Sequence, residues 1–361
     1  MTSLLVLLLL WAFPLSNSKG RLRQFLLTSE RFTRDAAVNE CRTNYTALAT
    51  VYDQQDNIEL MTLLINITDG SNPSGWIGTK IGNSHCKKWS NGDEVTFGRN
   101  FTSYTDSRCA AMKADGDWEF LTCTVTRHFM CYKQDVERAL YKLILQTKTW
   151  FEAQLYCREN HTDLVSISNE EENEKVWNEG KESNNPFWIG LLEDSVEWSD
   201  GGQSAYRNYV GELSGDYIFL NQDGNWSKSN KDIVQHAFCY KSFIHVSLGK
   251  MSWEEALDYC SSNFSGLLRI ESEDDQIETE REIKRQNISE PVWVGLRQSR
   301  LFGFWIWYNG LSVGNWTNWK EGSPPEHQVS QHCAALEKVK GQYKWCDKDC
   351  RSEFITLCEL K

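Results

Sequence analysis

The chain has 361 residues, enough for two or three domains, and its formal net charge of −12 argues against a nucleic-acid partner, because phosphate binding needs a basic surface. Hydrophobic residues make up 40% of the sequence and charged residues 24%, which excludes both a polytopic membrane protein and a disordered chain. The counts of 16 Trp and 12 Cys are unusual, and so many cysteines are typical of an oxidising compartment.

The N-terminal segment, residues 1–18, is predicted to be a secretory signal peptide. Leu4–Phe13 is an unbroken apolar run that is too short for a membrane span of about 20 residues but suits the core of a signal sequence. Ser16 and Ser18 are small residues suited to a cleavage site. We find no second apolar run of membrane length, so we expect a secreted protein or the ectodomain of a longer one, with no membrane span in this chain.

Candidate N-glycosylation sites agree with secretion. The motif Asn-x-Ser/Thr gives as candidates Asn44, Asn66, Asn100, Asn160, Asn263 and Asn287. The same motif at Asn225 and Asn315 precedes a tryptophan that is expected to be buried, so we do not expect glycan at those two positions.

Three internal repeats account for the rest of the chain. Each opens with a predicted helix that has a Ser or Thr cap, alanine and aromatic residues at helical spacing, and a cysteine near its end. These first helices are predicted within 32–41, 149–157 and 252–260. Each is followed by a small apolar strand, within 47–51, 163–167 and 266–270. A second, acidic helix comes next, at 53–65, 169–177 and 272–283.

Later landmarks recur in the same order. A Trp-Ile/Val-Gly motif begins at Trp76, Trp188 and Trp293. Units of this length are whole domains rather than solenoid repeats. Early helices followed by several short strands predict an α+β fold with antiparallel sheets. We expect the units to cover 22–133, 139–241 and 243–361. The connectors are short and poor in Gly, Ser and Pro, which favours a stiff tandem array.

The register of the repeats assigns ten of the cysteines to pairs. The cysteine of the first helix and the last cysteine bracket each unit, which gives the expected bridges Cys41–Cys131, Cys157–Cys239 and Cys260–Cys358. Units one and three have a further inner pair, namely Cys109–Cys123 and Cys333–Cys350. Unit two lacks both inner partners, so we expect it to be the least stable unit or to depend on its neighbours.

Two cysteines, Cys86 and Cys346, have no assigned partner. They either pair across domains, pair between chains, or stay free, and the sequence does not choose among these outcomes. A zinc site formed by His332, Cys333, Cys346 and Cys350 is an alternative, which secretion disfavours.

These motifs resemble the C-type lectin-like domain family, in three tandem copies similar to macrophage mannose receptor-type or short multi-domain proteins. The resemblance rests on a helix with Trp-x-x-Ala-x-x-x-Cys, on Trp-Ile-Gly-Leu, and on Trp-x-Asp-x-x-Cys followed by an apolar residue and a last cysteine. It implies a disulfide-bonded double-loop fold. In that fold the outer bridge ties the ends of each domain and the inner bridge holds the long loop that carries ligand.

Many members of the family bind sugar through calcium, which takes six to eight oxygen ligands. The family's ligands come from Glu-Pro-Asn or Gln-Pro-Asp in the long loop and from Trp-Asn-Asp before the inner cysteine. In unit three, Ser323 and Pro325 stand at the first motif, and Cys346 replaces the asparagine of the second. Asp347 is the one residue of unit three that matches the family's calcium ligands. Units one and two differ from the family's motifs even more. We therefore expect no cofactor at the family's sugar site, with Glu326 and Asp347 as weak metal candidates.

Three residues of unit three are candidate ligand contacts, namely Trp319, Glu326 and Asp347. For Trp319 the first alternative is packing in the core. An enzyme is not expected. Gly310-Leu-Ser312-Val-Gly314 matches the nucleophile-elbow pattern of hydrolases, but the residues after it are poor helix formers, and that motif needs a helix there.

The sequence thus predicts an extracellular binding protein that recognises a protein or glycan ligand without the family's usual calcium-dependent sugar site. Two alternatives stay open. One is a calcium-dependent lectin with a degraded site in unit three. The other is a structural array that forms disulfide-linked oligomers through Cys86 or Cys346.

Overall fold

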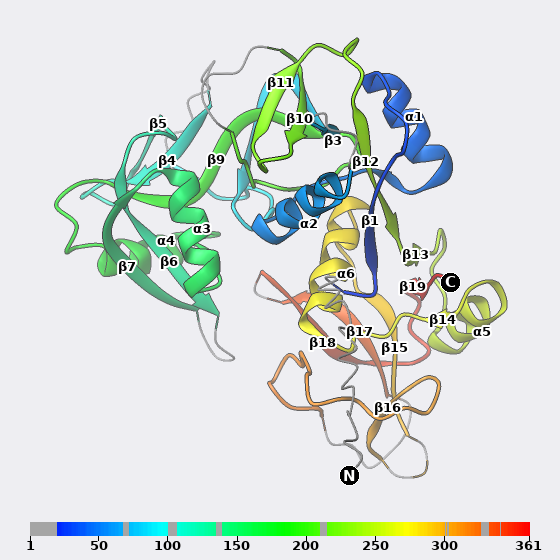
Figure 1. Ribbon diagram of the computed structural model, residues 1–361. Coiled ribbons are helices and arrows are strands. Elements are labelled where there is room, and N and C mark those ends of the chain that lie inside the picture. The colour runs from blue at the N-terminus through cyan, green and yellow to red at the C-terminus, as the bar shows by residue number, and fades with distance from the viewer. Residues whose placement is uncertain are drawn as a thin grey trace, which may run out of the picture.

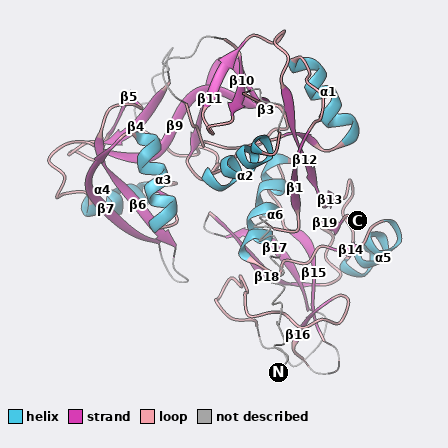
Figure 2. Ribbon diagram, in the orientation of Figure 1, coloured by secondary structure: helices cyan, strands magenta, loops and turns pink. Residues whose placement is uncertain are grey.

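The computed structural model describes residues 20–67, 72–99, 107–134, 139–209, 215–299, 301, 303–325, 332–339 and 341–361. The expected signal peptide 1–18, the candidate glycosylation site Asn100 and the candidate ligand contact Glu326 lie outside the described residues. Helices pack beside sheets in three compact bodies, so the fold is α+β, as the repeat pattern predicts (Figures 1 and 2). No helix among the described residues is long and apolar enough to cross a membrane.

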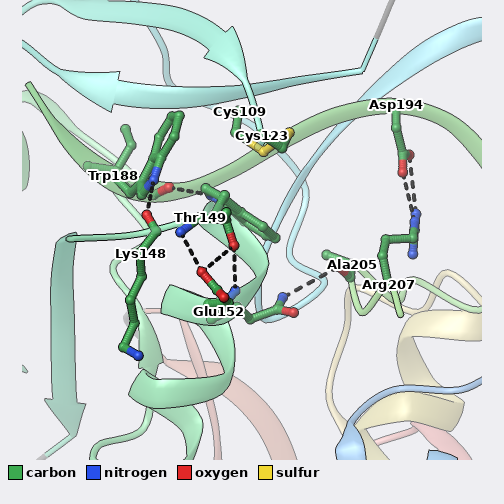
Figure 3. Close-up of a disulfide and its surroundings, with 12 residues drawn as sticks. Cys109, Cys123, Lys148, Thr149, Glu152, Trp188, Asp194, Ala205 and Arg207 are labelled. Atoms are coloured by element: carbon green, nitrogen blue, oxygen red, sulfur yellow. Dashed lines mark hydrogen bonds and ion pairs between the residues drawn. A yellow bond between two sulfur atoms is a disulfide. The ribbon is translucent and has the colours of Figure 1, made fainter. Parts of the chain in front are cut away.

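Each repeat contributes two helices. They are α1 (Arg34–Asn44), α2 (Gln54–Ile65), α3 (Trp150–Asn160), α4 (Glu170–Glu179), α5 (Trp253–Asn263) and α6 (Glu273–Arg285). Side-chain caps determine where most of them begin. Thr149 and Ser252 each form a complete capping box, with Glu152 and Glu255 respectively, and the first of these is drawn in Figure 3. Asp53, Asn169 and Ser272 cap the second helices by accepting a backbone N–H.

The strands fall into three groups, which we name by the bodies they build. The ranges given for each body refer to its described residues only. Body I (residues 23–81 and 196–242) contains β1 (Arg23–Leu27), β2 (Ala47–Leu48), β10 (Tyr217–Asn221), β11 (Trp226–Ser229) and β12 (His236–Ser242). Body II (residues 87–134 and 139–194) contains β4 (Arg108–Met112), β5 (Trp118–Thr122), β6 (Arg127–Gln134), β7 (Ala139–Lys148) and β8 (Asp163–Leu164). Body III (residues 244–361) contains β13 (Ile244–Val246), β14 (Gly266–Leu267), β15 (Val292–Gln298), β16 (Trp305–Trp307), β17 (His332–Val339), β18 (Gln342–Asp349) and β19 (Ile355–Glu359). Two long strands, β3 (Ser74–Trp89) and β9 (Phe187–Trp198), pass through both of the first two bodies.

The first two repeats exchange their C-terminal halves. β1 of unit one pairs with β12 of unit two, while β6 of unit one pairs with β7 and β8 of unit two. β3 and β9 run antiparallel between the bodies, from Thr79 opposite Trp198 to Trp89 opposite Leu191. The expected units 22–133 and 139–241 therefore each contribute to two bodies. The strands of body III, in contrast, all come from unit three, and Leu22 of unit one joins its core.

The hydrophobic cores combine residues from both repeats in the same way. In body I, Leu60 and Ile77 of unit one lie in one cluster with Trp226 and Phe238 of unit two. In body II, a second cluster joins residues of both units, namely Trp118, Met130, Val176 and Ile189. Because all of these side chains are buried, neither repeat closes a core of its own.

The exchange corrects two of the expected disulfides. The structure pairs Cys41 with Cys239 and Cys131 with Cys157, in place of the expected bridges Cys41–Cys131 and Cys157–Cys239. The remaining bridges are those that the repeat register predicts, namely Cys109–Cys123, Cys260–Cys358 and Cys333–Cys350. Body I thus contains the helices of unit one and the C-terminal half of unit two. That half of unit two has no inner disulfide.

The lengths of the two connections explain which repeats exchange. β6 ends at Gln134 and β7 begins at Ala139, a gap within the range of about two to five residues that hairpin loops use. Folding back locally costs less chain entropy than pairing β6 with the distant β1. Between β12 and β13, in contrast, Phe243 alone intervenes, which is too short for such a hairpin. β13 therefore pairs with β19, and unit three closes on itself.

Buried ion pairs attach body III to body I. Arg281 of α6 lies 2.9 Å from Asp53, at the start of α2, and Arg23 of β1 lies 3.2 Å from Glu278. Arg285 lies 3.2 Å from Asp200. Figure 1 shows α6 beside β1 and α2, which agrees with these contacts.

Candidate functional site

The candidate site predicted from the sequence lies in body III, between the long loop and the β17–β18 hairpin. Trp319 is 3% exposed, and its ring centre lies 4.6 Å from that of Trp305 and 5.6 Å from that of Trp345. A backbone bridge joins residues 319 and 345, so the tryptophan is packed beneath the hairpin. Trp319 is therefore a core residue, which was the first alternative, and it is not placed to contact a ligand.

Asp347, the surviving carboxylate of the expected calcium motif, contacts a histidine. Nδ1 of His332 lies 2.8 Å from each of the two Asp347 carboxylate oxygens, across the β17–β18 hairpin. Both side chains are partly buried. Asp347 thus lies two residues after Trp345, which bridges Trp319, and its carboxylate is paired with an imidazole.

Other side-chain oxygens on or beside this hairpin, which could in principle bind a metal ion, also have partners within body III. The Asn318 side-chain oxygen accepts a hydrogen bond from Lys344 Nζ at 2.7 Å, and Glu337 lies 2.7 Å from Lys348. The Lys348 hydrogen bond lowers the pKa of Glu337. Cys346 is a buried free thiol whose pKa is raised to about 11, first by burial and then by the nearby Glu337. Cys346 therefore remains protonated at neutral pH.

In the corresponding loop of unit two, an arginine of body I pairs with a carboxylate of body II. Arg207 forms a buried pair with Asp194, at 2.7 Å from Nε and 3.2 Å from Nη2, and Figure 3 shows the two groups facing each other. Nη1 of Arg207 donates to the backbone carbonyls of Ser204 and Tyr206. Burial lowers the arginine pKa, but Asp194 outweighs that effect and the net shift is upward. An internal cation thus neutralises this carboxylate.

The corresponding loop of unit one lies in body II and also contains an internal cation. Arg99 lies 2.9 Å from Asp117 and also pairs with Glu170 at the start of α4. The neighbouring Trp118 is buried and donates its indole N–H to Asn173 at 2.8 Å. The carboxylate that precedes the tryptophan motif is therefore held by an arginine.

The structure also bears on the chemical alternatives. Cys333 and Cys350 form a disulfide, so they cannot hold zinc as thiolates. Within the described part of the chain, no three His, Cys, Asp or Glu side chains are grouped to hold a metal ion. Ser312 lies in an isolated bridge with residue 306, and residues 313–319 form no helix, so the context of a nucleophile elbow is missing.

Sequence reasoning missed the Arg207–Asp194 pair, because neither residue belongs to a recognised motif. One hint was an arginine flanked by Tyr206 and Tyr209 in a loop where the family places calcium ligands. Of the candidate glycosylation sites, those that the structure describes are exposed, namely Asn44, Asn66, Asn160, Asn263 and Asn287.

Comparison with known proteins identifies similar sequences along most of the chain. The sequence model of a family described as "Lectin C-type domain" matches residues 30–133, 146–245 and 249–360. Lymphocyte antigen 75 of Homo sapiens is 26% identical over 241 residues, which are 55% of this chain and 14% of that protein. Secretory phospholipase A2 receptor of Oryctolagus cuniculus is 22% identical over 395 residues, covering 85% of this chain and 26% of the receptor. The chain thus spans only a small part of these two relatives.

Shorter proteins match single units. C-type lectin lectoxin-Lio1 of Erythrolamprus poecilogyrus is 29% identical over 138 residues, 38% of this chain and 78% of the lectoxin. Among solved structures, human lithostathine has 24% sequence identity and a TM-score of 0.30, covering 33% of this chain and 90% of its own.

Proposed function

Because the chain belongs to the C-type lectin domain family of binding proteins, we propose that it is an extracellular protein that recognises a protein or glycan ligand without calcium at the family's sugar site. The contact between His332 and Asp347 carries this proposal, because it pairs the last carboxylate of the calcium motif with an imidazole. A shell of six to eight oxygen ligands cannot be assembled around one occupied carboxylate.

The loops of the other two units support the same proposal. After the motif tryptophan these units have Glu119-Phe120 and Ser227-Lys228 in place of Asn-Asp. The nearby carboxylates Asp117 and Asp194 are already paired with Arg99 and Arg207. Adding a calcium ion there would place it beside an arginine, at a cost in repulsion that grows as the site is buried. The residues present therefore do not fit the family's calcium ion.

Binding, rather than catalysis, is proposed as the activity. Two of the matched relatives are, by name, a lectin and a receptor. Ser312 has no helix behind it, and we therefore assign it no catalytic role.

Calcium and EDTA provide the test. We would measure the thermal unfolding midpoint of the secreted protein, and its binding to an array of mannose- and galactose-terminated glycans, with calcium and with EDTA. The proposal predicts the same midpoint in both buffers, because only a ligand that binds the native state stabilises it. It also predicts that any glycan binding persists in EDTA.

An EDTA-sensitive rise in the midpoint, or sugar binding that requires calcium, would overturn the proposal. The variant Asp347→Asn then shows whether unit three is responsible. Asp349→Asn is a matched control, because Asp349 is an exposed carboxylate on the same strand, two residues further on.

A further inference from the structure

A cleft of about 1320 Å³ separates body II from body III. Its body II wall contains Tyr141 and the residues around the start of α4, and its body III wall contains the end of α6 and the β17–β18 turn. Pockets for small ligands usually have volumes of about 300–1,000 Å³, so this cleft is large enough for an extended chain.

One candidate glycosylation motif lies in the cleft wall. Asn287, Ile288 and Ser289 all line it. Asn287 follows α6 with a φ of 54°, a left-handed conformation that asparagine tolerates, and its N–H donates to the Lys284 carbonyl at 3.1 Å. Its side chain is exposed, whereas Ile288 packs against the core of body III. A glycan attached at Asn287 would therefore begin inside the cleft. The packing of Ile288 against the core fixes the position of its attachment point.

We propose that Asn287 carries an N-linked glycan whose first sugars lie in this cleft, between bodies II and III. The proposal rests on the extracellular placement proposed above. According to this proposal, the cleft is filled by a glycan attached to the protein itself and not by a separate ligand.

The charges of the cleft walls nearly cancel, which suits a neutral, polar chain. Five acidic and six basic residues line the cleft. Among them, Asp93 of body II lies 3.1 Å from Lys284 and 3.0 Å from Lys338. The walls also offer amide and hydroxyl groups, for example Gln203, Ser168 and Gln342, which can hydrogen-bond to sugar hydroxyls. Because attachment gives an effective concentration of about millimolar, weak contacts are enough to hold a tethered chain.

Two other candidate sites provide matched controls. Asn160 and Asn263 are the last residues of α3 and α5, both are exposed, and neither lines the cleft. Each donates its side-chain amide to a backbone carbonyl one helical turn earlier. Glycans at these positions would project into open solvent.

The experiment uses the full chain secreted from mammalian cells. Glycopeptide mass spectrometry measures occupancy at Asn160, Asn263 and Asn287, and a time course with a glycan-removing amidase measures release from the native protein. We expect Asn287 to be occupied and its glycan to be released about tenfold more slowly than the other two, because release requires the cleft to open. After denaturation, the three sites should be released at equal rates.

The variant Asp93→Ala tests the position of the glycan, because it removes both ion pairs that join the cleft walls. It should accelerate release at Asn287 and leave Asn160 and Asn263 unchanged. Equal native release at all three sites, or no response to Asp93→Ala, would overturn the proposal. An unoccupied Asn287 beside occupied controls would overturn it while leaving the extracellular placement intact. An absence of glycan at every site would contradict both.

Discussion

Cys41 and Cys239 are 198 residues apart in the sequence, yet their Cα atoms lie 5.2 Å apart in the disulfide that joins α1 to β12. The first is in unit one and the second is in unit two, so this bridge lies within body I but connects two repeats. Cys131 and Cys157 do the same in body II. The first two repeats therefore form one interlocked pair, and neither body can be completed by one repeat alone.

Truncating Trp319 should destabilise body III rather than remove a ligand contact. Trp319→Ala is expected to cost about 3–5 kcal/mol, as for other buried tryptophans, because its ring packs between Trp305 and Trp345. Chemical unfolding followed by tryptophan fluorescence measures this change. The matched variant Trp316→Ala should cost less, because Trp316 is only partly buried. Unchanged stability in Trp319→Ala would show that the side chain is free for binding.

Removing Arg207 should leave a buried carboxylate without its main partner. Arg207→Met is expected to lower the unfolding free energy of the interlocked bodies I and II by about 3–5 kcal/mol. Lys88, 3.9 Å from Asp194, should keep the loss near the lower end of that range. Urea unfolding monitored by hydrogen exchange of body I checks the value.

The double variant Arg207→Met with Asp194→Leu is the control for that experiment. It removes both charges of the pair, so part of the lost stability should return. Lys88 then loses Asp194 but keeps its hydrogen bond to the Val196 carbonyl. If the double variant is as unstable as the single one, the loss comes from packing of the arginine side chain and not from the ion pair.

The two free cysteines should react with thiol reagents at very different rates. Cys86 is exposed, whereas Cys346 is buried and its thiol pKa is raised to about 11. The thiolate is the reactive form, so at pH 8 only about one in a thousand Cys346 thiols is ready to react, and the fraction increases as the pH approaches 11. Iodoacetamide labelling read by mass spectrometry should modify Cys86 alone in native protein and both cysteines in denaturant.

The control for labelling is Cys86→Ser, which should leave the native protein unmodified at pH 8. If native Cys86 resists labelling until the protein is reduced, it is in a disulfide with another chain. That outcome would favour the oligomeric array.

Local sequence signals predicted the helices well. The capping residues Thr149 and Ser252 stand where the predicted first helices begin, because a cap depends only on residues a few positions apart. The fold class followed from the order of helices and strands. For Trp319, packing in the core was the first alternative to a ligand contact, because buried aromatic rings dominate core packing.

The exchange of halves could not be predicted from the repeats. Cys131 and Cys239 occupy equivalent positions in their repeats. Either one could therefore form a disulfide with Cys41, the cysteine of the first helix. Because both pairings bury equivalent residues, no single side chain favours one of them. Which cysteine pairs with Cys41 depends on the short connection from Gln134 to Ala139. That connection lets β6 pair with β7, and this strand pairing is visible only in the structure. The Arg207–Asp194 pair was missed because it depends on how the loop after β9 folds back on that strand, which no local motif indicates.

The most direct test of the interlocked pair is to cut the chain between the first two repeats. A protease site placed between Gln134 and Ala139, in a Cys86→Ser background, separates Cys41 and Cys131 from Cys157 and Cys239. The exchange predicts that the two fragments migrate together on a denaturing gel until they are reduced, because both outer bridges cross the cut. Fragments that separate without reduction would contradict it, since the bridges Cys41–Cys131 and Cys157–Cys239 would each lie within one fragment.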